Sequence, residues 1–123
     1  MLVKVGAYIS GGWLQAPWPT AATGYFTSEQ ACIFTLANPS SPAKLSVKVA
    51  QRAGCLLQGY WALGGGPDLG IVNNANTNTN NFSNLGHSYT LPTGLTYGND
   101  NAKTFLFGTS HFTPNEVEVF CEM

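Results

Sequence analysis

Alternating apolar and polar residues along the chain predict a series of short β-strands. Residues 3–9 place valine, alanine or isoleucine at every second position, before Gly11 and Gly12 interrupt the pattern. Residues 45–49 alternate leucine and valine with serine and lysine, and they form the clearest strand pattern in the sequence. A period of two puts the apolar side chains on one face of a sheet, so we expect both runs to be half-buried strands.

Short apolar runs and turn-forming residues predict the rest of the fold. Further strands are expected at residues 32–36, 56–57, 60–63, 69–72, 104–107 and 117–120. Residues 14–28 contain prolines and small residues, and we expect a loop there that carries Trp18 and Tyr25 next to Trp13. Residues 73–84 are rich in Asn and Thr and are expected to form a long surface loop. The pattern therefore predicts a mainly β fold, an antiparallel two-sheet β sandwich with short helical turns and long loops.

The composition fits a single domain with a weakly charged surface. The 123 residues suffice for one hydrophobic core, and 44% of them are hydrophobic. Only 9% are Asp, Glu, Lys or Arg, the net charge is −1, and the five basic residues are scattered along the chain. Such a chain lacks the basic patch that binds nucleic acid or anionic lipid. A weakly charged surface resists association poorly, which favours a protein that works within an assembly.

Cysteine content and apolar runs say little about the compartment. The odd number of cysteines, Cys32, Cys55 and Cys121, excludes a complete set of internal disulfides, and their spacing matches no zinc or CxxC site. We expect buried thiols, with Cys121 the candidate for an exposed position that pairs between chains. The first nine residues lack a signal-peptide pattern, and no run of about 18 apolar residues occurs, so a soluble chain is expected. The tripeptide that begins at Asn81 matches the glycosylation sequon, which slightly favours an extracellular location.

The order of several motifs resembles the TLDc domain family over nearly the whole chain. The first motif, in residues 8–18, is a glycine pair at the end of a strand with a tryptophan loop behind it. The second, in residues 32–39, is an apolar strand that runs into an Asn-Pro turn. The remaining motifs are the glycine triplet with Asp68, Asn-Phe-Ser-Asn-Leu-Gly at residues 81–86, Phe-Leu-Phe-Gly at residues 105–108 and the acidic strand at residues 116–120. The Asn-rich stretch is similar to that of TLDc variants in invertebrates and protists.

The resemblance implies a two-sheet sandwich and a role in protection against oxidative stress. For several intracellular members of the family it also implies binding to the vacuolar proton-pumping ATPase. In the family, a further segment with helices and an early strand precedes the position of Met1. We therefore expect the strand that begins at Val3 to have an uncovered edge. Because uncovered edges and apolar surface recruit partners, we expect a neighbouring chain to complete the fold.

Histidine-based catalysis has weak support in the sequence. His87 and His111 are the only histidines, and each has a serine beside it, Ser88 or Ser110. Neighbouring residues on a strand point to opposite faces, so these pairs are not expected to meet. We interpret both histidines as polar loop or edge residues.

Three other arrangements of polar or aromatic residues each have a structural alternative. Glu116 and Glu118 share a strand face about 7 Å apart, as a glycosidase pair would, but a solvated strand face explains them better. Asp68 with the asparagines of residues 73–76 offers oxygens for calcium, but turn-forming Asn is the stronger interpretation. Exposed aromatics beside the amide-rich loops would suit a sugar site, although core or lid positions are commoner for such residues.

The leading hypothesis is a non-catalytic protein-interaction module of TLDc type that needs no cofactor. Its contacts are expected on the Gly11–Tyr25 loop, on the Gly64–Asn84 region or on the N-terminal edge. The candidate interaction residues are Gly11, Gly12, Trp13, Trp18, Tyr25, Gly64, Gly65, Gly66, Asp68, His87 and Glu118. Two alternatives stay open. One is a structural subunit of a polymeric extracellular or organellar assembly, and the other is a sugar or small-ligand binder or a weak antioxidant enzyme.

Overall fold

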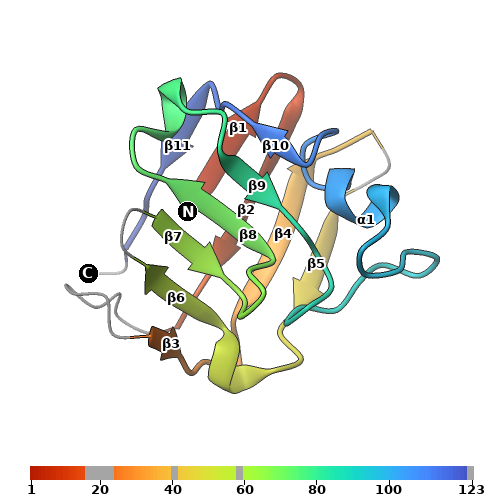
Figure 1. The fold of residues 1–123 in the computed structure, drawn as a ribbon. Helices are drawn as coiled ribbons and strands as arrows, with labels where there is room; N and C mark the ends of the chain where they lie inside the picture. The colour runs from red at the N-terminus through yellow and green to blue at the C-terminus, as the bar shows by residue number, and fades with distance from the viewer. Residues whose placement is uncertain (16–23, 40–41, 58–59, 122–123) are drawn as a thin grey trace.

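Two antiparallel β-sheets face each other in the computed structural model (Figure 1). The structure describes residues 1–15, 24–39, 42–57 and 60–121, and for residues 55–57 it describes the backbone only. The five-stranded sheet has the order β11-β1-β2-β4-β5 and contains β1 (Leu2–Val5), β2 (Tyr8–Trp13), β4 (Cys32–Ala37), β5 (Ala43–Ser46) and β11 (Glu116–Glu118). The six-stranded sheet has the order β10-β9-β8-β7-β6-β3 and contains β3 (Gly24–Phe26), β6 (Gly54–Leu57), β7 (Tyr60–Leu63), β8 (Leu69–Val72), β9 (Asn81–Ser83) and β10 (His111–Phe112). Short helical segments lie between strands: η1 (Ala50–Arg52), η2 (Ala75–Thr77) and α1 (Asp100–Thr104). The predicted mainly β, two-sheet architecture is confirmed.

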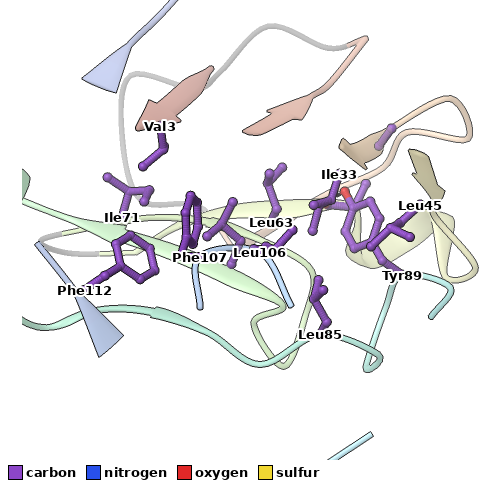
Figure 2. Packing of buried hydrophobic residues seen from close by; sticks show 13 residues of the cluster. Val3, Ile33, Leu45, Leu63, Ile71, Leu85, Tyr89, Leu106, Phe107 and Phe112 are labelled. Atoms are coloured by element: carbon purple, nitrogen blue, oxygen red, sulfur yellow. Dashed lines mark hydrogen bonds between the residues drawn. The ribbon is translucent and has the colours of Figure 1, made fainter. Parts of the chain in front are cut away.

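The hydrophobic core fills the space between the two sheets. Val3 and Ile33 point inward from the five-stranded sheet, and Leu63 points inward from the six-stranded sheet (Figure 2). Leu69 of the six-stranded sheet belongs to the same buried cluster. All four side chains are 0–1% exposed. Burying an aliphatic side chain of this size contributes about 1.5–3 kcal/mol, so the inward half of the period-two pattern supplies the main driving force for folding.

The predicted strand at residues 3–9 is two strands joined by a hairpin. Val5 pairs with Tyr8, and Gly6 in the turn has φ +57°, which glycine adopts without the steric cost of a Cβ atom. The glycine pair then lies inside β2 instead of ending a strand. A Cβ atom at Gly12 would collide with the Leu63 side chain of the facing sheet, so the glycine permits close packing of the two layers.

The predicted strand at residues 104–107 is instead the end of α1 and the turn that follows it. Leu106 and Phe107 are buried between the sheets, and the Phe107 ring packs against the Phe112 ring at a tilt of 43° with centroids 4.2 Å apart. The Leu106 carbonyl accepts a hydrogen bond from the buried Ser10 hydroxyl at 2.9 Å. Because a short apolar run has no distinctive periodicity, burial alone could not separate a strand from a helix end here.

The Asn-rich segment also differs from the predicted surface loop, because its last part is strand β9. Asn81 is fully buried, and its side chain forms four hydrogen bonds to backbone groups. Its Oδ1 accepts the Val72 N–H at 3.0 Å, and its Nδ2 donates to the carbonyls of Ala75, Asn78 and Phe112. Asn81 thus closes the preceding turn and joins it to β8 and β10.

The predicted uncovered edge at Val3 is wrong. Strand β1 lies inside the five-stranded sheet, with β2 on one side and β11 on the other. Val3 pairs with Ser10 in β2 and with Val117 in β11. The strand from the end of the chain therefore occupies the edge that was expected to recruit a neighbour.

Candidate functional site

The turn between β7 and β8, residues 64–68, is called the glycine turn below. Gly64 has φ +86°, and its N–H donates to the Ala53 carbonyl at 2.9 Å, while Asp68 N–H donates to the Leu63 carbonyl at 2.7 Å. A Cβ atom at Gly64 would collide with the Asp68 carboxylate. The backbone thus folds directly over this carboxylate, which explains the first glycine of the triplet.

The other two glycines of the triplet accommodate side chains from distant segments. A Cβ atom at Gly65 would collide with the Arg52 side chain, and one at Gly66 would collide with the His87 ring. Each glycine therefore leaves room for one polar residue to lie flat against the turn. The sequence indicated that side chains could not fit here, but it did not indicate which residues come close.

The Asp68 carboxylate is the centre of this site. It is fully buried and accepts three backbone hydrogen bonds, from Ser88 N–H to Oδ1 at 2.8 Å and from Gly86 and Tyr89 N–H to Oδ2 at 2.8 and 3.2 Å. Burial raises the pKa of the Asp68 carboxyl above its ordinary value, while the backbone hydrogen bonds and His87 act in the opposite direction. Because both oxygens face N–H donors, the carboxylate is not arranged to bind calcium.

Residues 86–89 are fixed by further hydrogen bonds to residues that flank β5 and β6. The Tyr89 hydroxyl is buried and donates to the Ala53 carbonyl at 2.6 Å, and burial raises its pKa. Lys48 Nζ donates to the Gly86 carbonyl at 2.6 Å, and the Lys48 N–H donates to the Ser88 carbonyl at 2.8 Å. Asp68 therefore connects the glycine turn to a segment that is already bonded to Lys48, just after β5, and to Ala53, just before β6.

Aromatic and basic side chains surround the glycine turn at the surface. Tyr25 is 54% exposed, its hydroxyl lies 3.4 Å from the Gly65 carbonyl oxygen, and the Arg52 guanidinium lies 5.6 Å from its ring centroid. On the other side, the His87 ring meets the ring of the 46%-exposed Tyr97 edge to face, with centroids 6.0 Å apart. The glycine-turn surface is defined here as Tyr25, Arg52, residues 64–66, His87 and Tyr97.

The expectation that the histidines point away from their neighbouring serines is wrong. His87 Nδ1 lies 2.9 Å from Ser88 Oγ, and His111 Nδ1 lies 3.3 Å from Ser110 Oγ. The Ser88 hydroxyl is fully buried and accepts the Gly65 N–H at 2.8 Å, so it is enclosed in the turn and has no access to a substrate. His111 is exposed on β10, at an edge of the six-stranded sheet, as the edge interpretation predicted.

The predicted interaction residues fall on two different surfaces. Tyr25, the glycine triplet and His87 meet at the glycine turn, around Asp68. Gly11, Gly12, Trp13 and Glu118 belong to the five-stranded sheet, where the two glycines are buried and the other two residues are exposed. Trp18 lies outside the described residues. Arg52 and Tyr97 were not predicted, because only tertiary contacts bring them to the turn.

The predicted glycosylation site at Asn81 does not fit the folded structure. A glycan would be attached to Nδ2, which is buried and donates hydrogen bonds to the Ala75, Asn78 and Phe112 carbonyls. A modified amide would lose these bonds and would require a surface position. The sequon therefore carries no indication of an extracellular location.

The remaining candidates for chemistry occupy structural or solvent-exposed positions. Glu116 and Glu118 are exposed on β11, and Glu116 lies 3.9 Å from Lys4 Nζ, in agreement with a solvated strand face. Cys32 is buried, which raises the pKa of its thiol, and Cys121 is exposed, as expected. Within the described residues no three His, Cys, Asp or Glu side chains gather as metal ligands. No helix in that part of the chain is long and apolar enough to span a membrane.

The family model for the TLDc domain matches residues 1–122. The chain therefore belongs to the TLDc domain family, as the order of its motifs indicated. No curated protein and no solved structure matches the chain.

Proposed function

We propose that the chain is a non-catalytic protein-interaction module of TLDc type that binds its partner through the glycine-turn surface. The observation that carries the proposal is the pair of exposed tyrosines, Tyr25 and Tyr97, held on either side of a turn that the buried Asp68 fixes. Tyrosine and arginine are enriched at the centres of protein interfaces, because they offer a large contact area together with polar groups. A surface that is ordered before binding loses less conformational entropy when a partner docks.

The polar groups beneath this surface favour binding over catalysis. The Asp68 carboxylate is saturated by backbone N–H groups, and the Ser88 hydroxyl is enclosed by the turn. His87 is half-buried, and its ring contacts are to the enclosed Ser88 hydroxyl and the Tyr97 ring. General acid–base chemistry needs a group that can reach a substrate proton, and neither the carboxylate nor the hydroxyl meets this requirement.

Membership of the family makes the vacuolar proton-pumping ATPase the first partner to test, and protection against oxidative stress the first cellular role. The basic Arg52 on the surface suits a partner segment that carries carboxylates.

A charge reversal on the glycine-turn surface tests the proposal. Arg52→Glu removes the cation next to Tyr25, and Lys103→Glu makes the same change of charge on α1 as a matched control. We expect Arg52→Glu to weaken binding to the purified ATPase about tenfold or more, and Lys103→Glu to leave it within about twofold. Equal affinity of both variants and the wild type would exclude this surface. Consumption of peroxide by the isolated wild-type chain at a catalytic rate would favour the enzyme alternative instead.

A further inference from the structure

The outer face of the five-stranded sheet carries an apolar strip between charged edges. Val3, Ile33 and Leu45 point into the core, so the alternate residues of these strands point outward. The outward apolar residues are Leu2, Ile9, Trp13, Phe34 and Leu36. Leu36 is 56% exposed and Trp13 is 38% exposed, so two large apolar side chains of this face are accessible to solvent.

A hollow interrupts this strip at the β4–β5 side. It is a hollow of about 600 Å³ that is open to solvent, and it is lined by Trp13, Cys32, Phe34 and Lys44, together with residues of the segment before β4. The lining is mixed in character, since Glu29, Lys44 and Ser46 lie beside the aromatic side chains, so the face is not flat here and offers room for polar as well as apolar side chains of a partner.

One register row crosses all five strands and has a regular order of chemical character. Leu2 pairs with Glu118 on one side and with Gly11 on the other. Gly11 pairs with Phe34, which in turn pairs with Lys44. From edge to edge the row thus reads acid, apolar, glycine, apolar, base. At the central glycine, the Met1 carbonyl oxygen comes closest to the position of a Cβ atom built there, and Phe34 Cζ lies 3.2 Å from the same position.

We propose that a second copy of this chain docks on this face, related by a two-fold axis that runs along β2. Rotation about this axis exchanges the two edges of the sheet and keeps Gly11 at the centre. Glu118 of each copy then lies opposite Lys44 of the other, and Leu2 lies opposite Phe34. An axis perpendicular to the strands would instead place Glu118 opposite Glu118, so the charges select one arrangement. The inference goes beyond the proposed function, because it concerns a different surface.

The size of the face sets the expected strength of the dimer. The five strands lie about 4.8 Å apart and are three to six residues long, so at about 3.3 Å per residue they cover roughly 360 Å² per copy. The resulting total of about 700 Å² is below the usual size of specific interfaces. We therefore expect a weak, reversible dimer with a dissociation constant on the order of 100 μM.

Charge-reversal variants, alone and mixed, test this arrangement by sedimentation velocity over a range of concentrations. Glu118→Lys places lysine opposite Lys44, and Lys44→Glu places glutamate opposite Glu118, so each variant alone should dimerise about tenfold more weakly than the wild type. An equimolar mixture of the two variants restores both opposite-charge pairs and should form dimers again. Asp100→Lys makes the same charge change on α1 and should dimerise like the wild type.

Each outcome of this experiment decides the inference. Both substituted residues are exposed, so thermal unfolding close to that of the wild type will show that the variants are folded. Loss of dimer in each single variant with recovery in the mixture supports the two-fold arrangement. A wild-type chain that stays monomeric at about 1 mM overturns it, as does a dimer that neither reversal weakens. None of these results changes the expected effect of Arg52→Glu on partner binding, so the two proposals fail independently.

Discussion

The Asp68 carboxylate accepts the backbone N–H of Ser88 at 2.8 Å, although the two residues are 20 positions apart in the sequence. Ser88 also bonds to the glycine turn, because its hydroxyl accepts the Gly65 N–H at 2.8 Å. The two residues thus form a reciprocal connection between the glycine turn and the segment at residues 86–89. The following predictions depend on this connection and on the buried amide of Asn81.

Replacement of Asp68 by asparagine is expected to destabilise the fold. The single side-chain oxygen of asparagine cannot accept all three backbone N–H groups that now bond to the carboxylate. The Nδ2 group, itself a donor, would face at least one of these N–H donors. Leaving buried N–H groups without acceptors costs about 1–3 kcal/mol. Urea unfolding should show this loss for Asp68→Asn and almost none for Asp100→Asn, because Asp100 is exposed. Equal midpoints for the two variants would mean that the carboxylate is not a structural centre.

The contribution of Asp68 to stability is expected to increase in acid. Its pKa is raised in the folded state, so the folded chain binds the Asp68 proton more tightly than the unfolded chain does. The corresponding stabilisation is fully present below the unfolded pKa of about 3.9 and is lost as pH rises through the folded pKa. The difference in the free energy of unfolding between the wild type and Asp68→Asn should therefore be larger at about pH 4 than at about pH 7. A difference that becomes smaller in acid would contradict the direction of the shift.

Alanine substitutions at two glycines separate backbone strain from packing. Gly64 and Gly94 have similar φ values, +86° and +91°, but only Gly64 has a neighbour, the Asp68 carboxylate, in the space a Cβ atom would fill. A positive φ alone costs alanine about 1–2 kcal/mol. Gly94→Ala should lose about this amount in thermal unfolding, and Gly64→Ala should lose clearly more. If both variants lose the same free energy, the turn can move away from Asp68 without cost.

The buried amide of Asn81 provides a test of the Asn-rich segment. Asn81→Asp replaces a donor that serves the Ala75, Asn78 and Phe112 carbonyls with an oxygen that repels them. We expect a loss of about 3 kcal/mol or more, since a buried charge is left against unpaired carbonyls. Asn80→Asp makes the same change at an exposed neighbour and should be nearly neutral. Similar melting temperatures for both variants would show that residues 73–84 form the surface loop that composition alone suggested.

The sequence allowed the mainly β architecture and the family to be predicted, because both depend on local patterns and on the order of motifs. Residues 32–37 and 69–72 form strands where apolar runs indicated them. Residues 104–107 were assigned wrongly as a strand, since a buried helix end and a buried strand have the same short apolar signature. The strand at Asn81 was missed because an Asn-rich composition favours turns. In the structure, however, the Asn81 side-chain amide forms hydrogen bonds to backbone groups such as the Val72 N–H and the Asn78 carbonyl.

The candidate site was predictable only in part. The glycine triplet, Asp68, Tyr25 and His87 were identified from their residue types. Three consecutive glycines indicate a place where side chains do not fit or where φ is positive. Their mutual arrangement was not predictable, because the Asp68 bonds join segments that are distant in sequence. The N-terminal edge was misjudged for the same reason: pairing of β1 with β11 joins the two ends of the chain.

Hydrogen–deuterium exchange of the chain with and without its partner tests the central claim most directly. The account predicts slower exchange on binding at residues 64–66 and 86–89 and around Tyr25, where the glycine-turn surface lies. Exchange in the exposed residues 93–94 should not change. Protection confined to another part of the molecule, with the glycine turn exchanging at its free rate, would contradict the claim that this turn binds the partner.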